Sequence, residues 1–378
     1  MLRQINKYLG KLTAHGLISN PGDAQFYGLD DEIYSNRDRI PEVVRALFDD
    51  LNINSLLIAR PEPLRWAIIG ELIRKRPETI SPSDSESLTF IHDIPVIRSF
   101  DAREIAGALS RRKGCIVEGL GIVTAGSVAL EQAFIVFSSI CFATFVKYFV
   151  DMLSAMSEAE GSPEPSPEEI AVCRGYLSRI AMNPMTPPLP GSLPTGETEI
   201  VSAMDAAGKT VVAAGLVDSF FGNISAREGD HIYISQTGSS LDELEGHIDR
   251  TAMDGSSTCE ITSSSELCAH VRIYELTGNR IIIHGHPRFS VIMSMAGGRL
   301  AFGDTRHIGG VPVVAGEVGA GARGLVHTLP EAIKEHQAAI VSGHGTFVAS
   351  DTSFHDAFVR LASIEEMCFH LCIKAVNP

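Results

Sequence analysis

The pattern of apolar and polar positions divides the chain into two parts that both mix helices and strands. In the second part, β-branched runs bounded by glycine predict strands at 232–235, 280–284 and 339–341. Stretches with helical spacing predict helices at 198–214, 264–276 and 329–336, and a last helix from Ser353 onward. The second part is therefore predicted to be an α/β domain.

The most apolar run of the chain lies in the first part, from Ala133 to Val146, between Gln132 and Lys147. This run is shorter than the roughly 20 residues that a membrane-spanning helix needs, so we expect a buried or interface helix and no membrane partner. The N-terminal residues contain no continuous apolar segment followed by small residues. We therefore expect no signal peptide.

Prolines separate the two parts. They cluster between residues 156 and 190, on both sides of a short helical stretch at 168–180. Proline at this density is compatible with neither a helix nor a sheet ladder. The predicted organisation is a first domain at 1–155, a proline-rich linker at 156–190 and a second domain at 191–378.

Two segments of the first part align with two segments of the second. Residues 115–126 match 339–350, and residues 56–63 match 281–288. The alignment places residues that cannot bind a metal opposite three histidines: Ala59 opposite His284, Pro61 opposite His286, and Leu120 opposite His344. We interpret the first part as a shortened, degenerate repeat that binds no metal; the alternative is chance similarity between short apolar strands.

The composition of the chain indicates its cellular compartment and the kinds of partner it can bind. The formal charge of −15 argues against a nucleic-acid partner, because such proteins of this size usually carry a basic face. The seven cysteines are scattered and form no CxxC pair, which is typical of reduced thiols and predicts a cytoplasmic protein. An anionic substrate would have to be bound by local donors.

The strongest chemical motif is the HGH sequence at the end of a predicted strand. Residues two apart on a strand point to the same side, so His284 and His286 can bind one ion. His344 lies between glycines directly after another apolar strand. Three histidines that leave one coordination position open are typical of a catalytic metal, and imidazoles favour zinc over calcium or magnesium. We expect one Zn²⁺ per chain; another divalent transition metal would also suit these ligands.

Small polar turns supply candidate anion-binding groups. Ser264 and Ser265 precede Glu266 at the start of a predicted helix, where free amides and the helix dipole favour an anion. Asn223, and the pair Thr237 and Gly238, lie in two further turns that can present amide and hydroxyl donors. Each turn also has a purely structural interpretation, as a helix cap or a tight backbone turn.

The order of these motifs, GNIS, TG, SSE, HGHP and GHG, resembles the class II aldolase/adducin family, in particular its fuculose-phosphate aldolases, over about residues 198–375. The resemblance implies a three-layer α/β/α sandwich around a mixed, mostly antiparallel sheet. It also implies zinc bound by the three histidines, and Glu266 as the catalytic acid/base. The residues that match the family's phosphate-binding positions are Asn223, Thr237, Gly238, Ser264 and Ser265.

The implied activity is that of a zinc-dependent aldolase, which cleaves a small phosphorylated ketose through an enediolate. The same site would also serve a sugar-phosphate 4-epimerase or a dehydratase. A third alternative is a non-catalytic, adducin-like assembly protein, although the adducin branch lacks the metal histidines. Since the family's enzymes commonly form tetramers, we expect a homo-oligomer, either a dimer or a tetramer.

The chain departs from the fuculose-phosphate aldolases in its tyrosines, which act there as further proton donors. Three tyrosines occur in the second half, and none is at a matching place: Tyr176, Tyr233 and Tyr274. His307, Asp304 or Tyr148 are alternative donors, as is a residue of a neighbouring chain.

Overall fold

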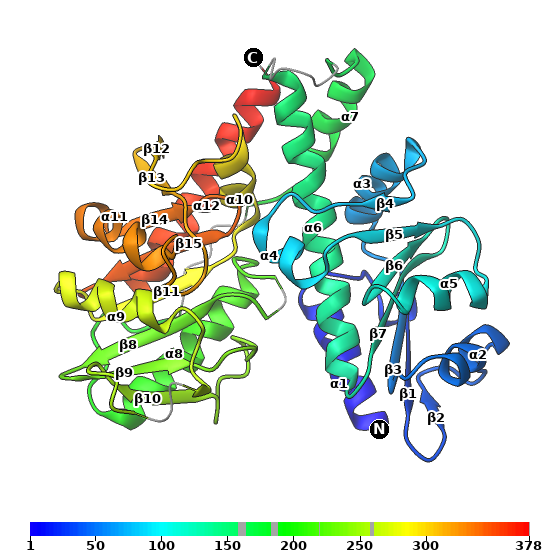
Figure 1. Cartoon of the computed structure of the whole chain (residues 1–378), viewed down its shortest axis with the longest axis horizontal. Helices are drawn as coiled ribbons and strands as arrows, with labels where there is room; N and C mark the ends of the chain where they lie inside the picture. The colour runs from blue at the N-terminus through cyan, green and yellow to red at the C-terminus, as the bar shows by residue number, and fades with distance from the viewer. Residues whose placement is uncertain (158–163, 183–187, 219, 258–260, 378) are drawn as a thin grey trace. The chain divides into compact units, whose positions relative to one another are not determined.

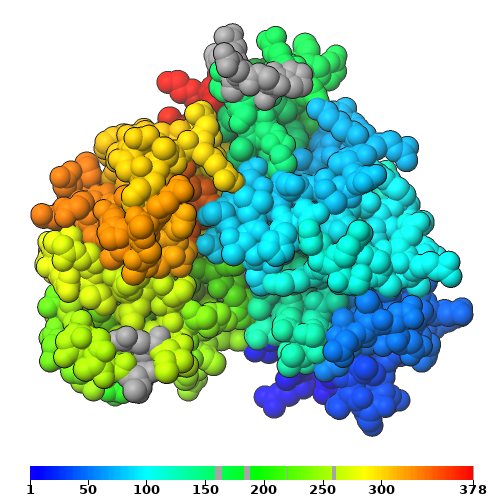
Figure 2. All heavy atoms as spheres, in the orientation of Figure 1, coloured from blue at the N-terminus to red at the C-terminus, as the bar shows by residue number. Residues whose placement is uncertain are grey.

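A computed structural model describes residues 1–157, 164–182, 188–218, 220–257 and 261–377 of the chain (Figure 1). The chain divides into two compact units, Met1–Phe149 and Val150–Pro378, called unit 1 and unit 2 below. Figure 2 shows the same view with every heavy atom drawn as a sphere. The predicted linker at 156–190 lies partly outside the described residues, and its described portion includes helix α7 (Pro167–Leu177).

Unit 2 is built around an open eight-stranded sheet. Its strand order is β10-β9-β8-β11-β15-β14-β13-β12. Neighbouring strands are antiparallel except β13 and β14, which are parallel. The strands are β8 (Asn223–Glu228), β9 (His231–Ser235), β10 (Ile248–Ala252), β11 (Ile281–Gly285), β12 (Thr305–Ile308), β13 (Val311–Val314), β14 (Ala338–Val341) and β15 (Gly345–Ser350).

Helices cover both faces of this sheet. One face carries α9 (Leu267–Leu276), the short η3 (Leu325–His327) and α11 (Leu329–His336), which share a buried apolar cluster with the strands. The other face carries α8 (Glu197–Ala213), α10 (Arg288–Met295) and α12 (Phe354–Val376). The predicted three-layer α/β/α sandwich with a mixed, mostly antiparallel sheet is therefore confirmed. The predicted helix at 264–276 begins later, at Leu267, which leaves Glu266 as its N-cap residue.

Unit 1 contains a seven-stranded sheet in the order β2-β1-β3-β7-β6-β5-β4. Its strands are β1 (Ala24–Leu29), β2 (Ile33–Ser35), β3 (Ser55–Ala59), β4 (Thr79–Ile80), β5 (Ile94–Ile97), β6 (Gly114–Val117) and β7 (Gly121–Gly126). Only the β5 and β6 pair is parallel. In unit 2, the seven strands β9-β8-β11-β15-β14-β13-β12 have the same spatial order and the same relative directions as the seven strands of unit 1. The remaining strand of unit 2, β10, has no counterpart in unit 1.

The helices of unit 1 connect these strands. They are α1 (Leu2–Ala14), η1 (Pro21–Asp23), α2 (Glu42–Asp50), α3 (Pro63–Arg74), α4 (Ser85–Phe90), α5 (Ala102–Leu109) and α6 (Leu130–Met156), whose residues from Val150 onward are counted in unit 2. Helix α6 is longer than the apolar run that predicted it, and by length and composition it could cross a membrane; 89% of its most apolar window is buried. A single such helix is weak evidence for a membrane span, because a buried core helix has the same length and composition.

Strand pairing corrects the alignment of the two parts by one residue. Val123 and Phe347 are equivalent in the alignment of 115–126 with 339–350; Val123 pairs with Ile58, and Phe347 pairs with His284. Ile58, not Ala59, therefore takes the register position of His284. A comparison of letters misses this shift because short apolar strands look alike in either register, whereas the pairing decides which face a side chain occupies.

The same shift places Arg60, not Pro61, at the position of His286. The Arg60 guanidinium donates hydrogen bonds to the backbone oxygens of Leu120, at 3.0 Å, and of Gly119. Leu120 is the residue aligned with His344. Arg60 has only donors and cannot bind a metal, and Ile58 and Leu120 have no ligand atoms at all.

Candidate metal and acid/base site

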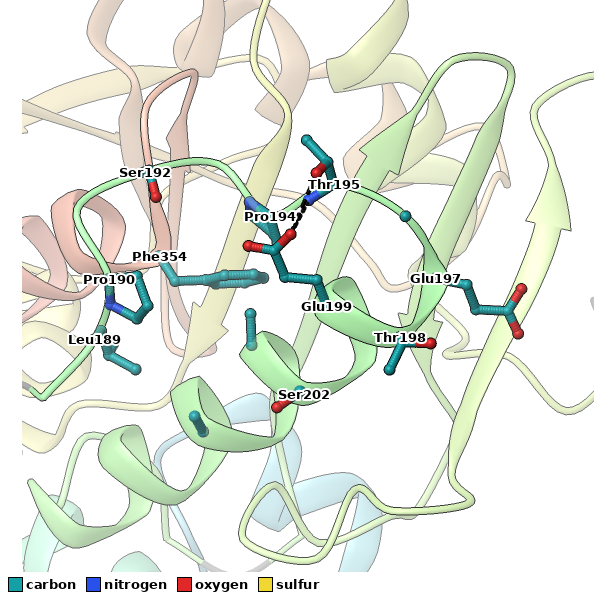
Figure 3. A pocket seen from close by; sticks show the side chains of 13 residues that line it. Leu189, Pro190, Ser192, Pro194, Thr195, Glu197, Thr198, Glu199, Ser202 and Phe354 are labelled. Atoms are coloured by element: carbon teal, nitrogen blue, oxygen red, sulfur yellow. Dashed lines mark hydrogen bonds between the residues drawn. The ribbon is translucent and has the colours of Figure 1, made fainter.

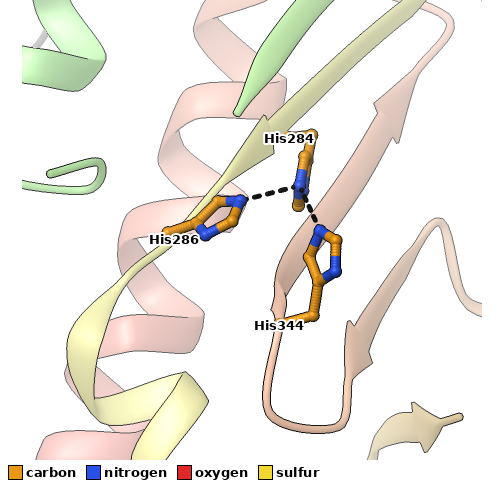
Figure 4. Close-up of side chains that lie close together, drawn as sticks. All are labelled: His284, His286 and His344. Atoms are coloured by element: carbon orange, nitrogen blue, oxygen red, sulfur yellow. Dashed lines mark hydrogen bonds between the residues drawn. The ribbon is translucent and has the colours of Figure 1, made fainter. Parts of the chain in front are cut away.

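Three buried histidines meet at the end of strand β11. His284 is on β11, and His286 is the first residue after this strand. His344 lies in the turn between β14 and β15. The imidazoles point toward one another (Figure 4). The Nε2 atom of His284 lies 3.0 Å from that of His286 and 3.1 Å from that of His344. One ligand atom from each residue lies within 4.8 Å of the others, so the three histidines can hold a metal ion.

The donor set fits a divalent cation. Zinc–nitrogen bonds of about 2.0–2.1 Å in a tetrahedral site separate the nitrogens by about 3.3 Å, close to the separations found here. Burial lowers the pKa of His284 to about 4 and that of His286 well below its usual value, so both rings are neutral at neutral pH. His284 Nδ1 lies 3.2 Å from the carbonyl oxygen of Thr346, which can only accept a hydrogen. The proton therefore sits on Nδ1, and the Nε2 lone pair faces the other two rings.

Glu266 lies against the same histidine nitrogens. Its Oε2 is 3.4 Å from Nε2 of His284, and its Oε1 is 3.3 Å from Nε2 of His344. Burial raises the pKa of this carboxyl, but the interactions with His284 and His344 and the Asn223 hydrogen bond outweigh burial and hold it below its usual range. Among the described residues, no lysine or arginine pairs with it. A buried carboxylate beside neutral imidazoles lacks a full positive charge, which a divalent cation would provide.

The pairing of β8 with β11 holds Asn223, the first residue of β8, beside Glu266. Asn223 pairs with His284 across the strands, and its Nδ2 donates a 2.5 Å hydrogen bond to Oε2 of Glu266. The preceding Gly222 has φ +83°, and a Cβ there would lie 2.6 Å from the carbonyl oxygen of His284. Only glycine allows this close approach of the turn to β11. In this structure the Asn223 amide is thus engaged by the carboxylate of Glu266.

The other predicted phosphate-binding residues form a continuous group next to Glu266. The backbone amide of Ser265 donates to Oγ1 of Thr237 at 3.1 Å, and the amide of Glu266 donates to Oγ of Ser264 at 3.3 Å. Thr237, Ser265 and the adjoining Gly238, whose φ is +71°, are exposed, whereas Ser264 is buried. The structure therefore places the hydroxyl groups at an accessible edge beside the buried carboxylate.

Asp249 on β10 anchors this serine loop, and the sequence contained no local signal for that role. Its Oδ2 accepts hydrogen bonds from Oγ1 of Thr262 at 2.7 Å and from Oγ of Ser263 at 3.0 Å. Its Oδ1 accepts a hydrogen bond from the Gln236 side chain at 2.7 Å. One buried carboxylate thus connects the loop that carries Glu266 to the sheet.

A second buried carboxylate supports the histidines from the opposite helical layer. Glu365 of α12 accepts hydrogen bonds from the backbone amides of Phe289 and Ser290, both at 2.8 Å, in the first turn of α10. Ser290 Oγ accepts a 2.9 Å hydrogen bond from Thr346, whose carbonyl oxygen faces His284. Burial raises the pKa of Glu365 to about 7. The chain of contacts fixes α10 where it leaves the HGHP motif.

Two aromatic rings pack against the histidines. Phe347 stacks on His284 with ring centroids 3.8 Å apart, and Phe221 stacks on His286 at 5.6 Å. Phe221 directly precedes the GN pair of the GNIS motif, but its contact with His286 depends on tertiary structure.

Two of the alternative proton donors, His307 and Asp304, lie away from this cluster, and Tyr274 is engaged elsewhere. His307 is on the edge strand β12, which three strands separate from β11, and Asp304 immediately precedes that strand. The Tyr274 hydroxyl is buried and lies 2.7 Å from Ser225 Oγ, which is also 2.7 Å from His270 Nδ1. Burial raises the Tyr274 pKa well above its usual value, which does not suit a proton donor.

Unit 2 also contains a cavity of about 620 Å³ that includes none of the predicted site residues. It lies between the segment 189–196, the first turns of α8 and Phe354 (Figure 3). Glu199 accepts hydrogen bonds from the amide and hydroxyl of Thr195 at its rim.

Comparison with known proteins identifies the family of unit 2. Residues 202–371 match the model of the class II aldolase and adducin N-terminal domain. This part of the chain therefore belongs to the class II aldolase and adducin family. No curated protein matches the sequence.

Similar solved structures include two aldolases and one class II aldolase domain. L-fuculose-1-phosphate aldolase from Thermus thermophilus is 26% identical, and the match covers 46% of this chain and 92% of that one, with a TM-score of 0.39. A sugar-phosphate aldolase from Thermotoga maritima is 14% identical over 48% and 96% of the two chains, with a TM-score of 0.37. The N-terminal class II aldolase domain of a Thermoplasma acidophilum protein is 13% identical over 50% and 99%, with a TM-score of 0.37.

Proposed function

We propose that unit 2 is a zinc-dependent aldehyde-lyase that cleaves a small phosphorylated ketose. The observation that carries this proposal is the convergence of the Glu266 carboxylate on the nitrogens of His284 and His344, at 3.4 and 3.3 Å. A purely structural cluster of histidines would not need a buried, ionised carboxylate at the same point. This arrangement brings an acid/base group next to a cation site.

Each part of the site has a chemical task in the cleavage. A divalent ion bound there would supply Lewis-acid stabilisation of negative charge on the substrate oxygens. Cleavage breaks one carbon–carbon bond; the hydroxyl carbon that becomes the aldehyde loses its O–H proton, and a proton is returned to the carbon of the other fragment. Glu266 is ionised and can carry a proton, a contribution of about 10²–10⁴-fold for general acid/base catalysis.

We assign substrate phosphate binding to the exposed edge beside Glu266. Thr237, Gly238 and Ser265 are accessible there, and Ser264 lies beneath them. Asn223 contacts the same carboxylate and is assigned to this phosphate-binding group as the family resemblance implies. Hydroxyl and amide donors bind a phosphate without lysine or arginine, which suits a chain with a charge of −15.

We further propose that residues 1–155 are a metal-free repeat of the same domain and that the chain assembles as a homo-oligomer in the cytoplasm. The shared strand order of the two sheets supports the repeat. Ile58, Arg60 and Leu120 at the three ligand positions support the absence of a metal.

The experiment that tests the function is a screen of phosphorylated ketoses with zinc-loaded protein, with release of triose phosphate as the readout. Turnover that disappears in Glu266→Gln would support the lyase. Metal-dependent isomerisation or loss of water without carbon–carbon cleavage would assign the site to an epimerase or a dehydratase. A purified chain without stoichiometric metal would instead support a non-catalytic assembly protein.

A further inference from the structure

Unit 1 contains a cavity of about 600 Å³, whose size is typical of small-molecule sites. The turns that lead into β3, β5 and β6 line it, together with the end of β7 and the first turns of α6. Its lining contains none of the positions equivalent to the metal ligands. The cavity is therefore independent of the chemistry proposed for unit 2.

Positive charge collects at the open side of this cavity. Arg111, Arg112 and Lys113 form the turn from α5 to β6, and all three line the cavity. Arg112 forms an ion pair with Asp93. Arg111 donates instead to the carbonyl oxygen of Gly107 at 3.1 Å. Within the described part of the chain, neither Arg111 nor Lys113 has a carboxylate within ion-pair distance, although acidic residues outnumber basic ones in the sequence.

Lys113 is exposed at the edge of the cavity, and its ammonium packs on an aromatic ring. Its Nζ lies 3.8 Å from the centre of the Phe90 ring, which also lines the cavity. Partial burial lowers its pKa, and no carboxylate among the described residues lies within ion-pair distance of the ammonium. An anion in the cavity would supply the missing counter-charge.

The inner wall is aliphatic. It is formed by Ile53, Ile91, Leu109, Ile135 and Val136. A small inorganic anion would leave this wall in contact with water, whereas a ligand with a hydrocarbon body would cover it.

We propose that this cavity binds a free amphiphilic anion, namely a carboxylate or phosphate monoester with an aliphatic body. The charged group contacts Arg111 and Lys113, and the hydrocarbon part lies against Leu109 and Ile135. A cavity of about 600 Å³ favours a single small molecule over the headgroup of a lipid that remains in a bilayer.

The test is calorimetric titration of the full chain with octyl phosphate, inorganic phosphate and octanol as probes. Octyl phosphate should bind at least about tenfold more tightly than either other probe. It alone carries both a negative group for the basic side chains and a hydrocarbon chain for the aliphatic wall. The double variant Arg111→Ala, Lys113→Ala should weaken octyl phosphate binding by about tenfold or more, as expected for charged hydrogen bonds. The matched control Arg45→Ala, Arg103→Ala removes the same charge from exposed positions outside the cavity and should bind as the natural chain does.

Equal weakening in the two double variants would overturn the proposal, because the effect would then come from net charge alone. Failure of octyl phosphate to bind the natural chain would also overturn it. Preferential binding to vesicles of phosphatidylcholine and phosphatidic acid, with the same dependence on Arg111 and Lys113, would replace the free ligand by a lipid. Thermal unfolding of each variant checks that the fold is retained, and Arg111→Gln, Lys113→Gln keeps the side-chain volume if the alanine pair does not fold.

Discussion

At the scale of single residues, the site combines groups whose charges depend on one another. Burial lowers the pKa of His284 and His286, and contacts with His284, His344 and Asn223 hold the pKa of Glu266 below its usual range despite burial. Removing one member therefore changes either the metal or the proton transfer, and the two effects can be measured separately.

We predict that His344→Ala removes most of the bound zinc and all metal-dependent turnover, because the two remaining imidazoles bind zinc too weakly. Elemental analysis of the purified variant measures the metal. His307→Ala is the control, since His307 is an exposed residue of β12. Full zinc occupancy in His344→Ala would show that the third ligand is assigned wrongly.

Glu266→Gln should leave zinc bound and lower kcat by about 10²–10⁴-fold, because an amide fills the same space but cannot act as a base. Metal content and turnover are measured on the same preparation. Activity within a few-fold of the natural chain would remove Glu266 from the mechanism.

Glu365→Gln should destabilise unit 2 by about 1–3 kcal/mol, because the amide group would face a backbone N–H donor in place of an acceptor. In the natural chain the folded-state pKa of about 7 exceeds the ordinary value of 4.5, so the folded state holds a proton that the unfolded state releases. The stabilisation from this group is therefore full below about pH 4.5 and decreases as the pH rises to about 7. Urea unfolding of both proteins across this range should show that slope only in the natural chain.

At the scale of elements, anchored loops position the groups of the candidate site. The serine loop precedes α9 and is tied to β10 by Asp249. The HGHP segment follows β11 and is tied to α12 by Glu365. The contacts of Asp249 are expected to affect the proposed phosphate-binding residues. Those of Glu365 are expected to affect the candidate metal ligands.

Asp249→Asn should accordingly raise KM for a phosphorylated substrate by about 3- to 10-fold, since one of the two hydroxyl contacts is weakened by roughly 1 kcal/mol. The zinc content should not change. Asp254→Asn, in the exposed turn after β10, is the matched control. A loss of zinc in Asp249→Asn would mean that the loop supports the histidines directly.

At the scale of the whole molecule, two sheets with one strand order carry different residues at the ligand positions. Unit 2 has three histidines, and unit 1 has Ile58, Arg60 and Leu120. The first sheet keeps the pairing directions and the parallel pair in the same place but lacks the metal-binding groups.

The full chain should therefore bind one zinc ion, and not two. Elemental analysis combined with light scattering gives the metal per chain and the number of chains in the assembly. Two metals per chain would refute the metal-free repeat, and a strict monomer would refute the homo-oligomer.

Local sequence was sufficient to predict the candidate metal ligands and the fold class of unit 2. A spacing of two on an apolar strand is sufficient to put His284 and His286 on one side, because side chains alternate along a strand. Glycine-bounded β-branched runs and helical spacing were sufficient to place β9, β11, α8 and α11, because each pattern reflects the period of one element. The motif order then identified the family.

Tertiary structure alone decided which residues meet. His284 and His344 are 60 positions apart, and only the pairing of β11 with β15 brings their nitrogens to 3.1 Å. Asp249 and Glu365 act through contacts between elements that no local spacing reveals. Whether Ala59 or Ile58 takes the position of His284 likewise depends on strand register. An apolar strand looks the same in either register, and only the pairing with its neighbour decides which face each side chain occupies.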